Sequence, residues 1–232
     1  MMGNEATTII LVHGAWGDGS HWRYVIQKLH HEGYKVRSVQ NPLTSIVDDI
    51  QKTSDLINMQ EGPVILVGHS YGGAVISAAG NHEKVAALVY IAAFAPDEGE
   101  SLMDLLARRK QPSGLFNIIP DRKGFQWISY EKFWESFAHD LDEDEALVMA
   151  LAQKPTHGSI FAAKAGKPAW KSKPCWYQVS DNDRMIPPAT QKEMAERIQA
   201  KKTIHLDASH ASLVSHADEI TALIKEAVAA LS

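Results

Sequence analysis

The sequence predicts an α/β fold with a mostly parallel central sheet flanked by helices. Short runs rich in β-branched residues alternate with longer segments of helical periodicity. Three of the short runs are apolar nearly throughout, as is typical of parallel strands that are covered on both faces. A chain of 232 residues is long enough for one such domain with an insertion.

Six short segments have the composition of strands. They are 7–12, 35–40, 63–68, 85–93, 175–180 and 202–206. Helical periodicity is found between and after them, at 21–33, 45–59, 187–200 and 217–231. Gly33 and Gly62 end the first two helices, and Pro187 or Pro188 stands where a first helical turn tolerates proline. This alternation predicts parallel strands joined by helices.

The alternation is interrupted between about Asp97 and Trp170. No convincing strand is present there, while large apolar residues recur at helical spacing in SLMDLLARR, SYEKFWESFAHDL and DEALVMALAQK. The sequence therefore predicts a helical insertion at 97–170, within a core formed by 1–96 and 171–232.

Composition and charge limit the classes of partner. The net charge is −5 and the isoelectric point is near 6.1, with no basic patch that would favour nucleic acid or a membrane surface. Cys175 is the single cysteine, and Met1–Ala6 lack the pattern of a secretory signal. The longest apolar run, 85–95, is too short to cross a bilayer. We expect a cytoplasmic protein with a small-molecule partner; the oligomeric state stays open, a homodimer through the aromatic insertion being one arrangement.

Ser70 stands in the stretch VILVGHSYGG, between Gly68 and Gly72, where a predicted strand passes into a predicted helix. This strand, turn and helix form the context of the G-x-S-x-G nucleophile elbow. The simpler alternative is that Ser70 caps the helix. A hydroxyl becomes a good nucleophile when an imidazole accepts its proton and a carboxylate orients that imidazole. The nucleophile hypothesis therefore requires an acid and a histidine further along the chain.

Both partners are found in the expected order. Asp181 and Asp183 follow the fifth predicted strand, and each could be the acid or a turn residue. Asp183 is favoured because it lies further into the loop. His210 occupies the loop before the last helix and is predicted to be the general base. His205, within a strand, and His216, near a helix start, are better explained by packing or capping.

Acyl transfer also needs backbone N–H groups that stabilise the oxyanion, each often worth about 3 kcal/mol. We predict that they come from Tyr71, after the nucleophile, and from Ala15 in the glycine-rich loop LVHGAWGDGSHW. His13 and His69 are interpreted as buried, hydrogen-bonded residues. Because His13, His21 and His69 lack a ligand spacing, no metal is expected, and the chemistry needs no organic cofactor.

The motifs HGAWGDGSHW, GHSYGG, SDNDRMIPP and SHASL occur in this order across nearly the whole chain. Together they resemble the α/β-hydrolase superfamily, most closely its small cofactor-free branch of plant methyl esterases, hydroxynitrile lyases and bacterial esterase-like hydrolases. The resemblance implies an α/β-hydrolase fold in which the insertion is a helical cap. It also implies Ser70 as nucleophile, Asp183 as acid, His210 as base, and Ala15 and Tyr71 at the oxyanion hole.

Several positions differ from those of other enzymes in this superfamily, and these differences narrow the range of reactions expected of this chain. Haloalkane dehalogenases and epoxide hydrolases carry an aspartate at the elbow, where this chain has Ser70. Hydroxynitrile lyases carry a lysine after the catalytic histidine and a threonine in the first loop, where this chain has Ala211 and Ala15. The resemblance therefore favours ester hydrolysis over these other reactions.

We expect Ser70 to form an acyl-enzyme from a small hydrophobic ester, which water activated by His210 then hydrolyses. Pocket candidates are the aromatic residues Trp16, Phe94, Trp127 and Trp134, with Phe116, Phe133 and Phe161 as further candidates, although each could equally belong to the core. The alternatives are hydrolysis of a thioester, lactone, amide or carbon–carbon bond, perhydrolysis, and a ligand-binding protein with little turnover. A basic triplet at 108–110 is explained most simply as a solvated helix end.

Overall fold

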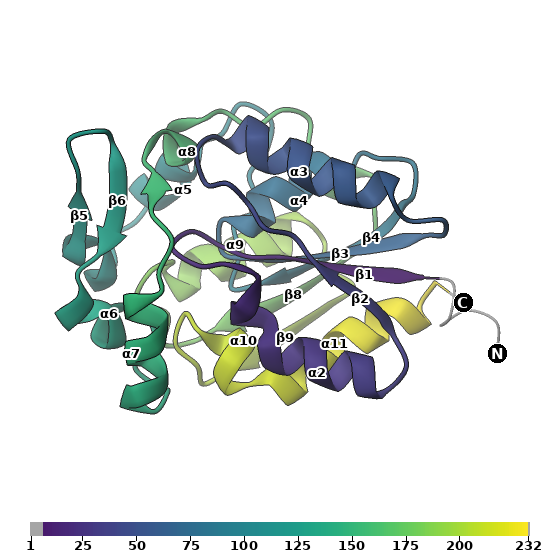
Figure 1. Ribbon diagram of the computed structural model, residues 1–232. Helices are drawn as coiled ribbons and strands as arrows, with labels where there is room; N and C mark the ends of the chain where they lie inside the picture. Colours follow the sequence, from purple (N-terminus) through teal and green to yellow (C-terminus); the bar gives the residue numbers. More distant parts are fainter. Residues whose placement is uncertain (1–6, 232) are drawn as a thin grey trace.

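The computed structural model describes residues 7–231 of the chain (Figure 1). Six strands form one sheet in the order β2-β1-β3-β4-β8-β9, and every neighbouring pair is parallel. They are β1 (Thr8–Val12), β2 (Lys35–Ser38), β3 (Val64–His69), β4 (Val85–Ile91), β8 (Cys175–Ser180) and β9 (Lys202–Leu206). The predicted α/β fold is confirmed. Residues 1–6, on which the expected lack of a secretory signal depends, lie outside the described residues.

Burial explains why these segments are strands. All residues of β1, β3 and β8 are buried, because these strands are covered on both faces. The edge strands β2 and β9 alternate between more and less exposed positions instead. Strand β4 ends at Ile91 rather than at the predicted Ala93, because Ala92 takes a positive φ of 42° and turns the chain away.

Helices cover both faces of the sheet, with α3 and α4 on one side and α2 and α11 on the other (Figure 1). Their bounds are α2 (Arg23–His31), α3 (Ile46–Asn58), α4 (Gly72–Ala79), α9 (Pro188–Arg197) and α11 (Ala217–Ala229), with short helices η1 (Gly19–Trp22) and α10 (Ser212–Ser215). In α3 the buried residues recur every fourth position, at Asp49, Thr53 and Ile57, and Ser45 caps the first turn by accepting from the Asp48 N–H.

The segment between β4 and β8 forms the cap, which lies at the left of Figure 1. Its helices are α5 (Leu102–Ala107), η2 (Ser113–Asn117), α6 (Tyr130–Phe137), α7 (Glu143–Leu151), α8 (Ser159–Ala162) and η3 (Ala169–Lys171). The two ends of the predicted insertion lie together, because Trp170 Nε1 donates to the Pro96 carbonyl at 3.0 Å. The cap is thus anchored where it leaves and rejoins the core.

The expectation that the insertion holds no strand is wrong. The cap contains a three-stranded antiparallel sheet of β5 (Ile118–Pro120), β6 (Phe125–Ile128) and β7 (Thr156–His157), in the order β5-β6-β7. These strands are too short to establish a period-two pattern in the sequence. Their pairing also depends on contacts between β6 and β7, which are distant in the chain.

The carboxyl ends of the parallel strands point toward the cap, as Figure 1 shows for the sheet as a whole. The loops that follow β1, β3, β8 and β9 therefore meet at one edge of the sheet, which is where ligands bind in open α/β sheets. Within residues 7–231, no helix has both the length and the apolar character required to cross a membrane.

Candidate active site

Ser70 occupies a sharp turn between β3, which ends at His69, and α4, which begins at Gly72. Its φ is +53°, a left-handed conformation that is strained for a residue with a side chain. A Cβ at Gly68 would lie 2.6 Å from the Gly72 carbonyl oxygen, and one at Gly72 would lie 2.4 Å from the Val12 carbonyl oxygen. Both flanking positions therefore require glycine, and the turn has the form of the predicted nucleophile elbow.

The surrounding backbone holds this turn in place. The Ser70 carbonyl accepts hydrogen bonds from the N–H groups of Gly73 and Phe94, both at 3.0 Å. The Ser70 N–H donates to the Ile91 carbonyl at 3.2 Å. These contacts tie the elbow to the end of β4, so the strained conformation is fixed by the fold.

The three predicted catalytic side chains form a continuous hydrogen-bonded series. Ser70 Oγ lies 2.8 Å from His210 Nε2, and His210 Nδ1 lies 2.6 Å from Asp183 Oδ2. The side chains of His210 and Asp183 are fully buried. Because an ionised carboxylate only accepts, Nδ1 carries the proton and Nε2 is left to accept from the Ser70 hydroxyl. The geometry is that of a nucleophile, a base and an orienting acid.

Asp183 is stabilised in its buried position by several donors. Its Oδ1 accepts from the N–H groups of Met185 and Ile186 at 2.7 and 3.0 Å, and its Oδ2 accepts from Gln191 Nε2 at 2.8 Å. Hydrogen bonds of this kind satisfy the oxygens of a buried carboxyl group and fix its position. The carboxylate is thus held in one orientation toward His210.

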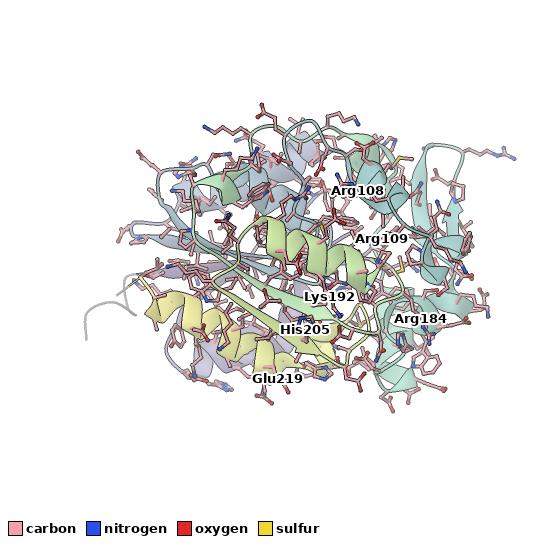
Figure 2. All side chains as sticks on the ribbon, turned by 180° about the vertical axis from the view of Figure 1, so that it is seen from behind. Arg108, Arg109, Arg184, Lys192, His205 and Glu219 are labelled. Carbon is pink, nitrogen blue, oxygen red and sulfur yellow. The ribbon has the colours of Figure 1, made fainter. Side chains whose placement is uncertain are left out.

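Asp181, the alternative acid in the sequence, lies elsewhere. Its carboxylate pairs with Lys192 at 3.0 Å and with His205 at 3.2 Å on the outer side of the molecule. Figure 2, seen from behind, shows the Lys192 and His205 side chains on this outer surface. The structure therefore brings Asp183 rather than Asp181 to His210.

His210 is enclosed by two other rings. The Phe137 ring is nearly perpendicular to the His210 ring at a centroid distance of 4.7 Å, and the His69 ring lies at 4.8 Å. His69 Nε2 donates to the His210 carbonyl at 2.8 Å. Burial lowers the pKa of His69 well below its ordinary value, so this ring stays neutral next to the His210 imidazole. His69 thus links the elbow directly to the loop that carries His210.

The loop after β1 lies directly against the nucleophile. A Cβ at Gly14 would stand 2.7 Å from Ser70 Cβ, so the backbone approaches as closely as glycine permits. Within residues 7–231, the N–H groups of Ala15 and Tyr71 have no hydrogen-bond partner, whereas the Trp16 N–H donates to Thr156 Oγ1 at 2.9 Å. Both predicted oxyanion donors therefore adjoin residues at the elbow, Ala15 next to Gly14 and Tyr71 next to Ser70, and their N–H groups are free to donate to a ligand oxygen.

His13 fixes the shape of that loop. Its Nε2 accepts from the Asn41 N–H at 2.9 Å, and its Nδ1 lies 2.8 Å from the Gly14 carbonyl, to which it donates. Burial lowers the pKa of His13 to about 4, so the ring is neutral and can make both contacts. His13 is buried and hydrogen-bonded, in agreement with the sequence interpretation.

A cavity of about 380 Å³ lies between the cap and the loop after β1. We call this loop the oxyanion loop, because it carries the predicted oxyanion donor Ala15. It is lined by Trp16, Met103, Leu106, Ala107, Gln111, Leu115, Ile118, Gln126, Gly158 and Phe161. Trp16 and Phe161 stack at 5.5 Å, and Phe161 lies 6.5 Å from the Tyr71 ring, so one side of the cavity lies near the two predicted oxyanion residues Ala15 and Tyr71. Among the described residues that line it, none carries a charge. We call this the cap pocket; its shape and lining suit an apolar ligand.

The four predicted pocket residues have different positions. Trp16 lines the cap pocket. Phe94 is buried beneath the elbow, where its N–H binds the Ser70 carbonyl. Trp127 lies in β6, and the alternation of side chains places it on the face opposite to the lining residue Gln126. Trp134 is 40% exposed on α6, lines a groove against α7, and donates to the Leu141 carbonyl.

Phe94, Trp127 and Trp134 therefore do not line the cap pocket, in contrast to the prediction. The sequence shows that the insertion contains aromatic residues that could line a pocket. Whether Trp127 and Trp134 face the pocket depends on the register of β6 and on the orientation of α6. Of the further candidates, Phe161 lines the cap pocket, Phe133 is fully buried and Phe116 is 71% exposed.

The basic side chains at 108 and 109 lie away from the cap pocket. Arg108 pairs with Glu100 and Glu193, and Arg109 pairs with Glu193 at 2.9 Å. Figure 2 shows both arginines on the rear surface, above α9. Both arginines thus form surface ion pairs, in agreement with the explanation of the triplet as a solvated helix end.

A model of the alpha/beta hydrolase family matches residues 9–223, nearly the whole chain. The chain belongs to this family. Membership agrees with the parallel sheet, the elbow after β3 and the cap between β4 and β8.

Relatives of this α/β hydrolase are named as esterases and hydrolases. A segment of 117 residues is 34% identical to a carbendazim hydrolyzing esterase of Nocardioides sp. (strain SG-4G), and the match covers 44% of this chain and 48%, about half, of that relative. Methylesterase 7 of Arabidopsis thaliana is 25% identical over 96% of both chains. The crystal structure of a pyrethroid hydrolase from Sphingobium faniae JZ-2 has a TM-score of 0.84 at 24% identity, over 97% of this chain and 98% of that one. The sequence relatives support a carboxylic ester hydrolase, and the structural likeness shows the shared fold.

The described part of this α/β hydrolase offers no metal centre. Across residues 7–231, no group of three or more His, Cys, Asp and Glu side chains is arranged to hold a metal ion. His21, one of the three histidines of the first loops, is buried against Phe137 at 6.1 Å, and burial lowers its pKa to about 3. Its position indicates a packing role beside the triad.

Proposed function

We propose that this α/β hydrolase is a serine esterase that cleaves a small, hydrophobic carboxylic ester through an acyl-enzyme on Ser70. The observation that carries the proposal is the continuous series from Asp183 through His210 to Ser70, with contacts of 2.6 and 2.8 Å. The absence of charge in the described lining of the cap pocket supports an uncharged substrate. The names of the relatives agree with ester hydrolysis.

In the first half of the reaction, Ser70 Oγ attacks the ester carbonyl while His210 Nε2 takes the hydroxyl proton. Negative charge develops on the carbonyl oxygen, where the N–H groups of Ala15 and Tyr71 stabilise it. Asp183 stabilises the imidazolium that forms. The tetrahedral intermediate then collapses: the bond to the alcohol oxygen breaks, and His210 returns its proton to the leaving alcohol.

In the second half, water replaces the alcohol. His210 Nε2 accepts a proton from the water as its oxygen attacks the acyl carbon, and the same two N–H groups bind the new oxyanion. Collapse of this second intermediate breaks the bond to Ser70 Oγ, which recovers its proton from His210. The products are a carboxylic acid and an alcohol, and the enzyme is regenerated.

A fluorophosphonate probe and p-nitrophenyl esters of increasing acyl length test this proposal. We expect one covalent adduct, located by peptide mass spectrometry at Ser70, and ester turnover that Ser70→Ala abolishes together with the adduct. Ser77→Ala is the matched control, because Ser77 is a buried serine of α4 bonded to Gly73 and Tyr90. An adduct and turnover that survive in Ser70→Ala would contradict the proposal.

The same experiment separates the rival functions. A ligand-binding protein with little turnover would hold an ester unchanged and remain unlabelled. Parallel assays with thioester, lactone and amide substrates would show whether the triad prefers another acyl compound. A preference for a thioester, a lactone or an amide would change the substrate in the proposal and leave the role of Ser70 intact.

A further inference from the structure

The small cap sheet presents one face to the cap pocket. In an antiparallel sheet, residues paired across strands share a face, and successive residues alternate. Ile118 pairs with Ile128, and Gln126 pairs with Thr156. Ile118 lines the cap pocket, while Ile128 and Thr156 are fully buried. The side chain of Gln126 therefore belongs to the inner face, with these apolar and buried neighbours.

The amide of Gln126 lies in this setting without a hydrogen bond. In the described part of the chain, neither its Nε2 nor its Oε1 has a hydrogen-bond partner, although the residue is half-buried and lines the cap pocket. Removing water from an amide without replacing its hydrogen bonds costs free energy. A ligand that fills this space must therefore offer the amide a hydrogen-bond partner.

The space for this amide is provided by a glycine. A Cβ at Gly158 would stand 2.8 Å from Gln126 Nε2, so a larger residue would displace the amide. Gly158 has a φ of −61°, which any residue can adopt, so a larger residue there would disturb the position of the amide and not the backbone. Gly158 itself lines the cap pocket, which places the amide at the pocket wall.

The backbone of Gln126 is connected to the oxyanion loop. Its carbonyl accepts from Trp16 Nε1 at 3.1 Å, and Trp16 follows Ala15 in the chain. The amide of Gln126 therefore lies in the cap pocket, on a residue whose backbone holds the Trp16 side chain next to Ala15.

We propose that Gln126 forms a polar subsite of the cap pocket that binds a neutral carboxamide on the apolar part of the ester substrate. A glutamine amide offers one carbonyl acceptor and one NH₂ donor, and a carboxamide offers the complementary pair. A charged group would find no counter-charge among the described residues that line the pocket. This inference rests on the proposed esterase function and names the substrate class more closely.

Two matched pairs of esters test the subsite. In one pair the acyl chain ends in a carboxamide or in an isopropyl group of the same shape, and in the other pair the alcohol carries these groups. We expect Gln126→Leu to lower the ratio of kcat/KM, carboxamide over isopropyl, at least tenfold in one of the pairs. Gly158→Ala should lower the same ratio by crowding the amide.

Trp127→Phe is the matched control, because Trp127 is the next residue of β6 and faces the opposite side. It should leave the ratio unchanged. Equal ratios in the wild type and in Gln126→Leu would overturn the subsite, as would a loss of preference in Trp127→Phe alone.

Two further measurements keep this result separate from the esterase proposal. Fluorophosphonate labelling and turnover of p-nitrophenyl acetate are measured in the wild type and in Trp127→Phe, where both should persist. The dissociation constants of the non-hydrolysable methyl ketone analogues of the two acyl groups report on Gln126 without any turnover. If the wild type neither labels nor turns over acetate, the esterase proposal fails, while a carboxamide preference in binding that Gln126→Leu removes still supports the subsite.

Discussion

Asp183 illustrates how much a single buried carboxylate depends on its donors. Two backbone N–H groups and Gln191 orient it, and its remaining contact is the short bond to His210 Nδ1. Asp181, two residues earlier, has the same chemistry but pairs with surface cations. The difference in role between these two residues arises from the direction of the loop after β8.

Replacing Asp183 by asparagine should lower kcat by a factor of about 10⁴, because an amide NH₂ facing Nδ1 favours the tautomer whose Nε2 cannot accept the Ser70 proton. The measurement is kcat/KM for p-nitrophenyl acetate, with folding checked by circular dichroism. Asp181→Asn is the control and should stay within about twofold of the wild type. An equal loss in the two variants would contradict the assignment.

Among single residues, those of the triad could be predicted and those of the pocket could not. Ser70, Asp183 and His210 lie directly after strands whose apolar runs are legible in the sequence, so their meeting at one edge follows from the topology. Trp127 and Gln126 are neighbours, and a shift of one residue exchanges their faces. That register depends on the pairing of β6 with β5 and β7, which the sequence does not reveal.

At the scale of elements, the cap holds three loops of the site, those that follow β1, β8 and β9. Thr156 of β7 accepts from the Trp16 N–H in the oxyanion loop. The Phe137 carbonyl, at the end of α6, accepts from the Ala211 N–H beside His210. The Gly114 N–H in η2 donates to the Arg184 carbonyl beside Asp183. The cap therefore positions the catalytic loops in addition to enclosing a pocket.

Thr156→Val tests this positioning. Trp16 has a φ of +60°, a conformation that costs about 1–3 kcal/mol and must be maintained by its contacts. Loss of the Thr156 hydroxyl leaves the Trp16 N–H without its acceptor and loosens Ala15, so we expect kcat for p-nitrophenyl acetate to fall about tenfold to a hundredfold.

Thr156→Ser, which keeps the hydroxyl, should retain most of the activity lost in the valine variant. Steady-state kinetics of both variants separate kcat from KM. A valine variant with the wild-type kcat would show that the oxyanion loop does not depend on the cap.

The main sheet and its covering helices were predicted closely, since long apolar or periodic segments determine them. The cap sheet was not predicted, because strands of two to four residues are too short to show an alternation of apolar and polar residues. Strand β5 also ends in a proline, Pro120. Local sequence patterns thus determine the fold of the core, whereas the fold of the cap depends on pairing between segments that are distant in the chain.

For the molecule as a whole, buried histidines make stability depend on pH. Burial lowers the pKa of His13 to about 4 and that of His21 to about 3, against an ordinary value of 6.5. Between these values the unfolded chain binds protons that the native protein excludes. The contribution of these two rings to the free energy of unfolding should therefore be constant well above pH 6.5. It should fall as the pH drops through 6.5 to about 4, by up to about 1.4 kcal/mol per pH unit for each ring.

Urea denaturation at pH 7.5, 6.5, 5.5 and 4.5 checks this dependence, and His21→Gln should reduce its slope. Carboxylates such as Asp104, whose pKa is lowered to about 2 mainly by its hydrogen bond from Lys164, act only below about pH 4 and outside this window. A free energy of unfolding that is constant from pH 7.5 to 4.5 would show that these rings take up protons as readily in the folded protein as in the unfolded chain.

The acyl-enzyme on Ser70 is the central claim, and rapid-quench mass spectrometry tests it most directly. The protein is mixed with p-nitrophenyl acetate, quenched in acid within the first turnover and digested, and the peptide that contains Ser70 is examined. We predict an acetyl group on Ser70 that forms with the burst of p-nitrophenol and decays at the steady-state rate. Full turnover with no acyl group on Ser70, or with the acyl group on another residue, would contradict the account.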